Sequence, residues 1–199
     1  MTSPWDQRYA TAAYYYGTEP NDFLRMHAAE LPPRGRVLCL GEGEGRNAVY
    51  LATFGHAVTA VDGSAVGLDK ARRLAAERGT TLVTVTADLA DYVVEPGAWD
   101  AIVSIWCHLP RDLRARLHRA CVAGLRPGGI FLLEAYTPQQ LAYGTGGPST
   151  ADLMPTLAQL REELAGLELL RAAELERTVQ EGQGHHGPSA VVQILARAR

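Results

Sequence analysis

The chain has 199 residues, of which 47% are apolar and 21% are charged, and its formal net charge is −3 at pH 7. This length suits one domain with a continuous core, and the composition argues against intrinsic disorder and fibrous repeats. Because the basic residues are scattered among the acidic ones, we expect no surface built to bind nucleic acid.

The cysteine pattern and the amino end bear on the location of the protein. Cys39 and Cys107 lie in apolar runs and Cys121 lies in a helical pattern. This usage is typical of reduced core thiols and not of a disulfide or zinc framework. Residues 2–16 lack a signal pattern, and no apolar run approaches the ~20 residues that a membrane span requires. We therefore expect a cytoplasmic protein with no membrane partner.

Short apolar runs alternate with helical patterns along the chain, which predicts a parallel sheet with helices on both faces. The expected strands are residues 36–40, 57–61, 81–87, 100–106 and 130–136. The expected helices are residues 46–53, 64–78, 110–125 and 156–164, the last capped by Thr156 and Gln159. Two more strand-like runs, 167–179 and 190–198, predict a terminal β-hairpin whose turn contains Gly182, Gly184, His185, His186 and Gly187.

A glycine-rich turn, Gly41-Glu42-Gly43-Glu44-Gly45, follows the first expected strand and precedes a helix. Glycines in such a turn let a ligand approach the strand end and the helix amino terminus. Dinucleotide enzymes carry G-x-G-x-x-G here and hold pyrophosphate, whereas this turn is G-x-G-x-G and carries two carboxylates that repel pyrophosphate. The carboxylates of Glu42 and Glu44 suit a cationic ligand such as S-adenosylmethionine; the alternative is a turn that binds no ligand.

Carboxylates also follow the next two expected strands. Asp62 ends the second strand, where it can accept hydrogen bonds from both ribose hydroxyls, or can instead cap the helix that begins near Ser64. Asp88 follows the third strand, where it can accept a hydrogen bond from the adenine amine, or can instead cap a loop. We also expect cofactor contacts from Tyr16, Gly41, Glu42, Gly43, Gly45, Asn47, Gly63, Ser64, Leu89 and Ile105.

The glycine turn, Asp62, Asp88 and the turn at 125–129 together resemble the class I S-adenosylmethionine-dependent methyltransferases over about residues 34–136. More narrowly, residues 16–21, 41–47 and 107–110 resemble the small bacterial tellurite-resistance methyltransferases, and this resemblance covers nearly the whole chain.

The resemblance implies a doubly wound α/β fold with a mostly parallel seven-stranded sheet, in which strand seven lies antiparallel between strands five and six. We expect one domain over residues 1–199. Within it we expect an amino-terminal lid at 1–30, a cofactor-binding core at 34–136, and an acceptor-side loop, helix and terminal hairpin at 137–199.

Methyl transfer from a sulfonium requires the acceptor lone pair ~3 to 3.5 Å from the methyl carbon, and it requires a base only when the acceptor keeps its proton. His108 follows the fourth strand, at the edge where ligands bind, so it is a candidate base or orienting group. Alternatively it caps the next helix or packs on the adenine. Tyr14, Tyr15 and Tyr16 predict an aromatic lid that excludes water, with Tyr16 a second catalytic candidate. The alternative for these tyrosines is simple packing against the sheet.

Other polar and aromatic residues border these positions. Arg46 and Asn47 either contact an anionic group of a ligand or cap their helix. The residues expected in the core or in the walls of the acceptor pocket are Trp106, Cys107, Glu134, Tyr136 and Tyr143. His185 and His186 are expected in a solvated loop, because two adjacent histidines seldom complete a metal site. We expect no bound metal.

These observations predict an S-adenosylmethionine-dependent methyltransferase that acts on a small-molecule acceptor. The resemblance implies a thiol or a chalcogen oxyanion as that acceptor. The chain lacks the Asp/Asn-Pro-Pro-Tyr sequence of enzymes that methylate exocyclic amines or glutamine amides. The alternatives are a protein or RNA methyltransferase and a non-catalytic sensor of S-adenosylmethionine. We expect a monomer or a homodimer.

Overall fold

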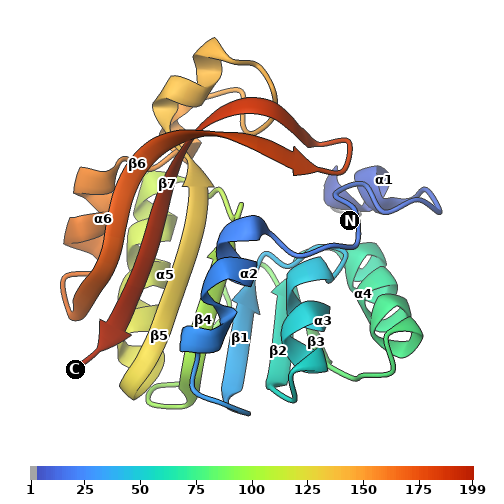
Figure 1. Cartoon of the computed structure of the whole chain (residues 1–199), viewed down its shortest axis with the longest axis horizontal. Coiled ribbons are helices and arrows are strands. Elements are labelled where there is room, and N and C mark those ends of the chain that lie inside the picture. The colour runs from blue at the N-terminus through green and yellow to red at the C-terminus, as the bar shows by residue number, and fades with distance from the viewer. Residues whose placement is uncertain (1–3) are drawn as a thin grey trace.

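The structure is a computed structural model that describes residues 4–199, so residues 1–3 of the expected lid lie outside the described part of the chain. Seven strands form one sheet in the order β3-β2-β1-β4-β5-β7-β6 (Figure 1). The strands are β1 (Arg36–Leu40), β2 (Ala57–Asp62), β3 (Val83–Thr86), β4 (Trp99–Ile105), β5 (Leu125–Tyr136), β6 (Leu167–Glu181) and β7 (His185–Ala198).

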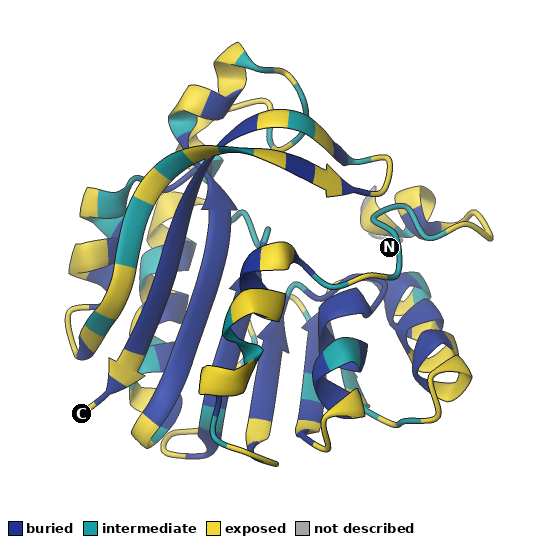
Figure 2. Cartoon of the chain, viewed as in Figure 1, coloured by how far each residue is buried: buried dark blue, intermediate teal, exposed yellow. Residues whose placement is uncertain are grey.

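The first five strands pair in parallel, and β7 runs antiparallel between β5 and β6. This confirms the doubly wound, mostly parallel sheet and its expected strand order. Parallel strands need helical crossovers, and these cover both faces of the sheet. As a result β1, β4, β5 and β7 are buried along most of their length, whereas most residues of the edge strand β6 are exposed or half-buried (Figure 2).

Helices lie on both faces of the sheet, as the alternating pattern predicts. The apolar residues of α2 (Asp22–His27), α3 (Arg46–Thr53) and α4 (Ala65–Glu77) pack on one face. Those of α5 (Arg111–Gly124) and α6 (Leu157–Glu163) pack on the other. The predicted capping box of α6 is confirmed, because the Thr156 hydroxyl accepts from Gln159 N and the Gln159 side chain accepts from Thr156 N.

Some elements differ from the sequence-based expectation. The helices α1 (Pro4–Tyr9) and α2 were not predicted, because six residues are too few to show a helical period. The same holds for three short 3-10 helices, Ala28–Glu30, Pro138–Ala142 and Ala151–Leu153. Strand β7 begins at His185, so the hairpin turn is shorter than expected and contains neither histidine.

The carboxyl ends of the parallel strands meet at one edge of the sheet. The β6–β7 hairpin bends over this edge and brings its turn close to α1 (Figure 1). A covered edge of this kind is where open α/β sheets bind ligands. In the described part of the chain, no helix is long and apolar enough to cross a bilayer.

Candidate functional site

The loop after β1 is shaped by three glycines with positive φ, which are Gly41 (+61°), Gly43 (+61°) and Gly45 (+92°). A Cβ added to Gly45 would lie 2.4 Å from the Cβ of Ala71 in α4, and one added to Gly41 would lie 2.9 Å from the Sγ of Cys107. Glycine is therefore required here both by the backbone conformation and by close packing.

Glu42 faces the start of α3. Its Oε1 accepts hydrogen bonds from the backbone N–H groups of Asn47 (3.0 Å) and Ala48 (2.8 Å), so this carboxyl group satisfies two of the first amides of the helix. Burial raises the pKa of Glu42 to about 7, although the two N–H groups oppose the shift. Glu42 thus remains a candidate neighbour of a cationic ligand.

Glu44, which the sequence suggested as a neighbour of a cationic ligand, has partners within the protein. It forms a buried ion pair with Lys70 of α4 and accepts hydrogen bonds from the backbone N–H groups of Tyr15 (2.7 Å) and Tyr16 (3.3 Å). Glu44 therefore anchors the amino-terminal segment to the glycine loop, and its charge is already compensated.

Asp62 and Asp88 lie at the ends of neighbouring strands. Asp62 accepts hydrogen bonds from the backbone N–H groups of Gly43 (2.8 Å) and Ser64 (2.7 Å), and burial raises its pKa. The cap of α4 is Ser64, whose hydroxyl accepts from Gly67 N, and not Asp62. Asp88 is exposed, and its Oδ1 accepts the N–H of Ala90 (2.8 Å).

The carboxyl groups at this edge of the sheet fit S-adenosylmethionine. The ligand offers two ribose hydroxyls, an adenine amine, an ammonium and a sulfonium, which are all donors or cations. The sheet edge offers three carboxyl groups, from Glu42, Asp62 and Asp88, while Leu89 and Ile105 provide buried apolar surface beside them. Among the residues 41–45 there is no Lys or Arg to bind a pyrophosphate. The edge therefore favours S-adenosylmethionine over a dinucleotide.

The amino-terminal segment lies over this edge. A Cβ added to Gly43 would come 2.7 Å from the hydroxyl oxygen of Tyr9, so α1 packs directly on the glycine loop. The Tyr14 hydroxyl donates to the carbonyl of Lys70 (3.1 Å), and the Lys70 ammonium donates to the carbonyl of Ala13 (2.6 Å). The segment is therefore attached to α4 as well as to the loop.

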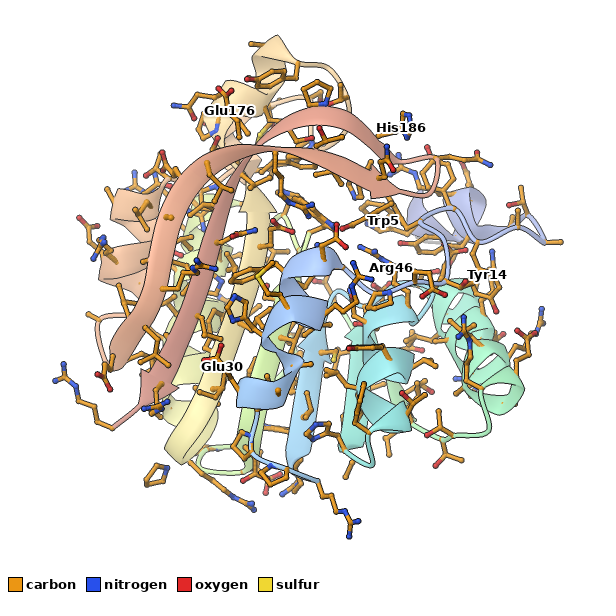
Figure 3. All side chains as sticks on the ribbon, viewed as in Figure 1. Trp5, Tyr14, Glu30, Arg46, Glu176 and His186 are labelled. Atoms are coloured by element: carbon orange, nitrogen blue, oxygen red, sulfur yellow. The ribbon has the colours of Figure 1, made fainter. Side chains whose placement is uncertain are left out.

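Five rings form an aromatic cluster above the end of β4: Tyr16, Trp106, His108, Tyr136 and His185. Trp106 stacks on Tyr136 at a centroid separation of 4.4 Å, and Tyr16 stacks on His185 at 4.7 Å. His185 is only 5% exposed, so its expected place in a solvated loop is wrong. The bend of the hairpin over the sheet edge buries it. His186 is exposed, as expected, and points away from the domain (Figure 3).

His108 lies in this cluster, and its hydrogen bond and its pKa argue against a role as a catalytic base. Its Nε2 accepts the backbone N–H of Tyr136 (3.1 Å), so the lone pair that a base would use is engaged. Burial, together with the charge of Arg114, lowers the pKa of His108 to about 4. It does not cap α5, whose N-cap is Pro110. This geometry favours a role in positioning the end of β5.

A buried ionic network lies beside the aromatic cluster. Glu181 at the end of β6 is ion-paired with Arg46 and accepts hydrogen bonds from Trp106 Nε1 (2.5 Å) and Asn21 Nδ2 (2.8 Å). Figure 3 shows the Arg46 side chain rising from α3 toward the hairpin. Glu134 of β5 is ion-paired with Arg177 of β6 and also accepts from Asn21. The network thus holds the end of β6 against α3 and the start of α2 against β5 and β6.

The remaining sequence candidates have structural partners. Asn47 Oδ1 accepts the backbone N–H of Asn21 (2.9 Å), so Asn47 holds the start of α2. Tyr143 is hydrogen-bonded to Glu176 of β6, outside the aromatic cluster. All three cysteines are free. Within residues 4–199 no three His, Cys, Asp or Glu side chains are grouped so as to hold a metal.

Comparison with known proteins agrees with this geometry. Residues 37–129 match the model of the methyltransferase domain family. Through this domain the chain is similar to the class I S-adenosylmethionine-dependent methyltransferases. The cofactor of the family is S-adenosylmethionine, and the carboxyl groups at the sheet edge fit this cofactor.

Two curated relatives share the core of the chain. A 2-heptyl-1-hydroxyquinolin-4(1H)-one methyltransferase from Mycobacteroides abscessus is 29% identical over 117 residues, which are 57% of this chain and 52% of that protein. A tRNA 5-carboxymethoxyuridine methyltransferase from Escherichia coli is 30% identical over 128 residues, which are 60% of this chain and 47% of that protein. The chain thus spans about half the length of these relatives.

Two solved structures share the fold. A protein described in a study of the conversion of a disulfide bond into a thioacetal group during echinomycin biosynthesis aligns with a TM-score of 0.79 and 22% identity, over 100% of this chain and 91% of that one. TehB from Haemophilus influenzae aligns with a TM-score of 0.73 and 21% identity, over 98% of this chain and 66% of that one. At these identities the likeness shows the fold alone.

Proposed function

We propose that the protein transfers the methyl group of S-adenosylmethionine to a small-molecule acceptor. The observation that carries this proposal is the double cover of the sheet edge, where the amino-terminal segment and the β6–β7 hairpin meet above the glycine loop. A site enclosed from two sides favours a compact acceptor over a macromolecule and keeps water away from the reacting atoms.

The bound cofactor would supply an electrophilic methyl group on a sulfonium. In our proposal Asp62 and Asp88 hold the ribose and the adenine amine, and the carboxyl group of Glu42 lies near the cation. Gly41, Gly43, Gly45, Gly63 and Ser64 shape the cradle. Tyr16 closes the site, so that positioning and desolvation supply much of the catalysis.

We infer that the acceptor is a thiol or a chalcogen oxyanion, because the sequence resembles the tellurite-resistance methyltransferases. The Mycobacteroides relative, named for a small quinolone, supports a small acceptor. The free cysteines support a cytoplasmic location.

The proposed function is tested by measuring the release of S-adenosylhomocysteine from S-adenosylmethionine with small thiols, selenite, tellurite and phenols as acceptors. Acceptor-dependent release supports the proposal, and binding of the cofactor without release for any acceptor favours a sensor.

An RNA acceptor is the second candidate, and the Escherichia coli relative named for tRNA favours it. RNA binding by basic side chains weakens steeply with salt. We expect only weak, salt-sensitive binding, since the net charge is −3 and the basic residues are dispersed. Sub-micromolar binding to tRNA at physiological salt would favour RNA over a small molecule.

A further inference from the structure

His185 lies within the aromatic cluster, a position that the sequence analysis did not predict. The Tyr16 ring lies on one side at a centroid separation of 4.7 Å, and the Trp106 ring lies at 4.9 Å. Trp106 directly follows the last residue of β4, and Tyr16 is bonded to the glycine loop through Glu44. His185 is therefore held between the closing segment and the edge where the cofactor is expected.

The two ring nitrogens of His185 have different surroundings. Its Nδ1 lies 2.9 Å from the hydroxyl oxygen of Tyr136, which can accept a hydrogen bond from a ring N–H. We assign the ring proton to Nδ1, which leaves the lone pair on Nε2.

The two histidines of the cluster differ in this respect. The Nε2 lone pair of His108 is engaged by the N–H of Tyr136. Over residues 4–199, no hydrogen bond to Nε2 of His185 is found. His185 is therefore the ring of the cluster that can still accept a hydrogen bond from a ligand.

The surroundings of His185 keep it uncharged. Burial lowers its pKa to about 2, and nearby basic groups add to the shift. Arg46 at the start of α3, Arg8 in α1 and Arg177 in β6 are positively charged, and a proton on His108 would be a further opposing charge. The ring is thus a neutral hydrogen-bond acceptor at every pH at which the protein is expected to work.

We propose that Nε2 of His185 accepts a hydrogen bond from a proton-bearing methyl acceptor, a thiol or a phenol, and so directs the lone pair of its sulfur or oxygen toward the methyl carbon. This inference rests on the proposed function and specifies that the small-molecule acceptor carries its proton on the sulfur or oxygen that is methylated. In the step, the bond from the acceptor atom to the methyl carbon forms while the bond from that carbon to the sulfonium sulfur breaks. The proton of the acceptor passes to Nε2 and then to water. A weak base suffices, because a protonated thioether or ether is far more acidic than an imidazolium.

The kinetic test uses benzyl mercaptan, a thiol that keeps its proton at neutral pH, with three variants. His185→Phe keeps a ring in the cluster but has no acceptor nitrogen, and should lower kcat about 100-fold. His185→Gln places an amide oxygen near the position of Nε2 and should recover part of this loss. His186→Gln, at the exposed neighbour, should match the wild type. His185→Phe, which keeps a ring beside Tyr16, and His186→Gln should bind S-adenosylhomocysteine like the wild type, which separates a lost acceptor contact from a lost cofactor site.

The second test does not depend on any acceptor. In the complex with S-adenosylhomocysteine, ¹⁵N NMR of the histidine rings should show His185 as the neutral Nδ1–H tautomer at pH 7 and pH 5.5. The signal is assigned by its loss in His185→Gln. An Nε2–H tautomer or an imidazolium at pH 7 would overturn the proposal, as would full activity of His185→Phe toward benzyl mercaptan. If the wild type binds the cofactor product but methylates nothing, the proposed function fails, and the NMR result still decides the tautomer.

Discussion

Tyr16 stacks on His185 with ring centroids 4.7 Å apart and planes inclined by 23°, and this contact joins the amino-terminal segment to the hairpin near the other end of the chain. A backbone hydrogen bond from Gln183 N to the carbonyl of Tyr15 (2.8 Å) reinforces the junction. The two segments that cover the sheet edge are thus attached to each other, so we expect them to open and close together.

Gly184→Ala tests this junction. A Cβ at Gly184 would lie 2.2 Å from Cε1 of Tyr16 and 2.6 Å from Cε1 of Tyr15, whereas the φ of Gly184 lies outside the left-handed region and adds no backbone strain. The variant should displace both rings, weaken S-adenosylhomocysteine binding about tenfold, and change the free energy of unfolding by less than about 1 kcal/mol. Calorimetry and urea unfolding measure the two effects. Gln183→Ala, which trims an exposed side chain beside it, is the matched control and should bind normally.

Hydrogen exchange tests whether the amino-terminal segment moves. Tyr9 packs on Gly43 and Gly67, so a ligand beside the glycine loop requires α1 to shift. We expect the amides of residues 4–21 to exchange fast in the free protein and to be protected when S-adenosylhomocysteine is bound. Deleting residues 1–16 should leave a folded domain with weaker cofactor binding and no turnover. Equal protection of the segment in both states would reduce Tyr14, Tyr15 and Tyr16 to structural packing.

The carboxyl group of Glu42 should make stability depend on pH. Its pKa is about 7 in the folded state against 4.5 in the unfolded chain, so folding takes up a proton between these values. The contribution of Glu42 to the free energy of unfolding should therefore be largest below about pH 4.5. This contribution should fall by on the order of 3 kcal/mol as the pH rises to 7. In Glu42→Gln the amide oxygen still accepts both N–H bonds of α3, and this part of the pH dependence should vanish. Urea unfolding of both proteins at several pH values between 4.5 and 8 measures the difference. Parallel curves would contradict the raised pKa.

The fold was largely predictable from the sequence, because runs of branched apolar residues and capped helical patterns are local signals. The predicted strand 36–40 has the same bounds as β1, and the predicted strand 57–61 differs from β2 only in its last residue. By contrast, the position of His185 depends on how a fourteen-residue strand bends over the sheet edge, which no short window of sequence encodes. The partners of Glu44 and Arg46 are also distant in the chain, since Lys70 and Glu181 lie on other elements. From the sequence Glu44 and Arg46 therefore looked like ligand contacts, whereas in the structure each forms an ion pair with a distant residue.

Asp88→Ala offers a comparison within the cofactor site. Asp88 is exposed and makes one local bond, so its loss should weaken cofactor binding through the adenine amine and leave stability within about 0.5 kcal/mol of the wild type. Thermal unfolding with and without S-adenosylhomocysteine measures both. If S-adenosylhomocysteine raises the Tm of Asp88→Ala as much as that of the wild type, Asp88 does not contact the adenine and serves only as a loop cap.

Calorimetric titration of S-adenosylhomocysteine into the wild type and Asp62→Ala tests the central claim most directly. Asp62 joins the glycine loop to the start of α4, and a hydrogen bond to a charged group contributes about 1.5 to 3 kcal/mol. We predict clear binding to the wild type and at least about tenfold weaker binding to the variant, with circular dichroism showing that the variant is folded. Equal affinity in the two folded proteins, or tight binding of NADH in place of S-adenosylhomocysteine, would contradict a methyltransferase site at this edge of the sheet.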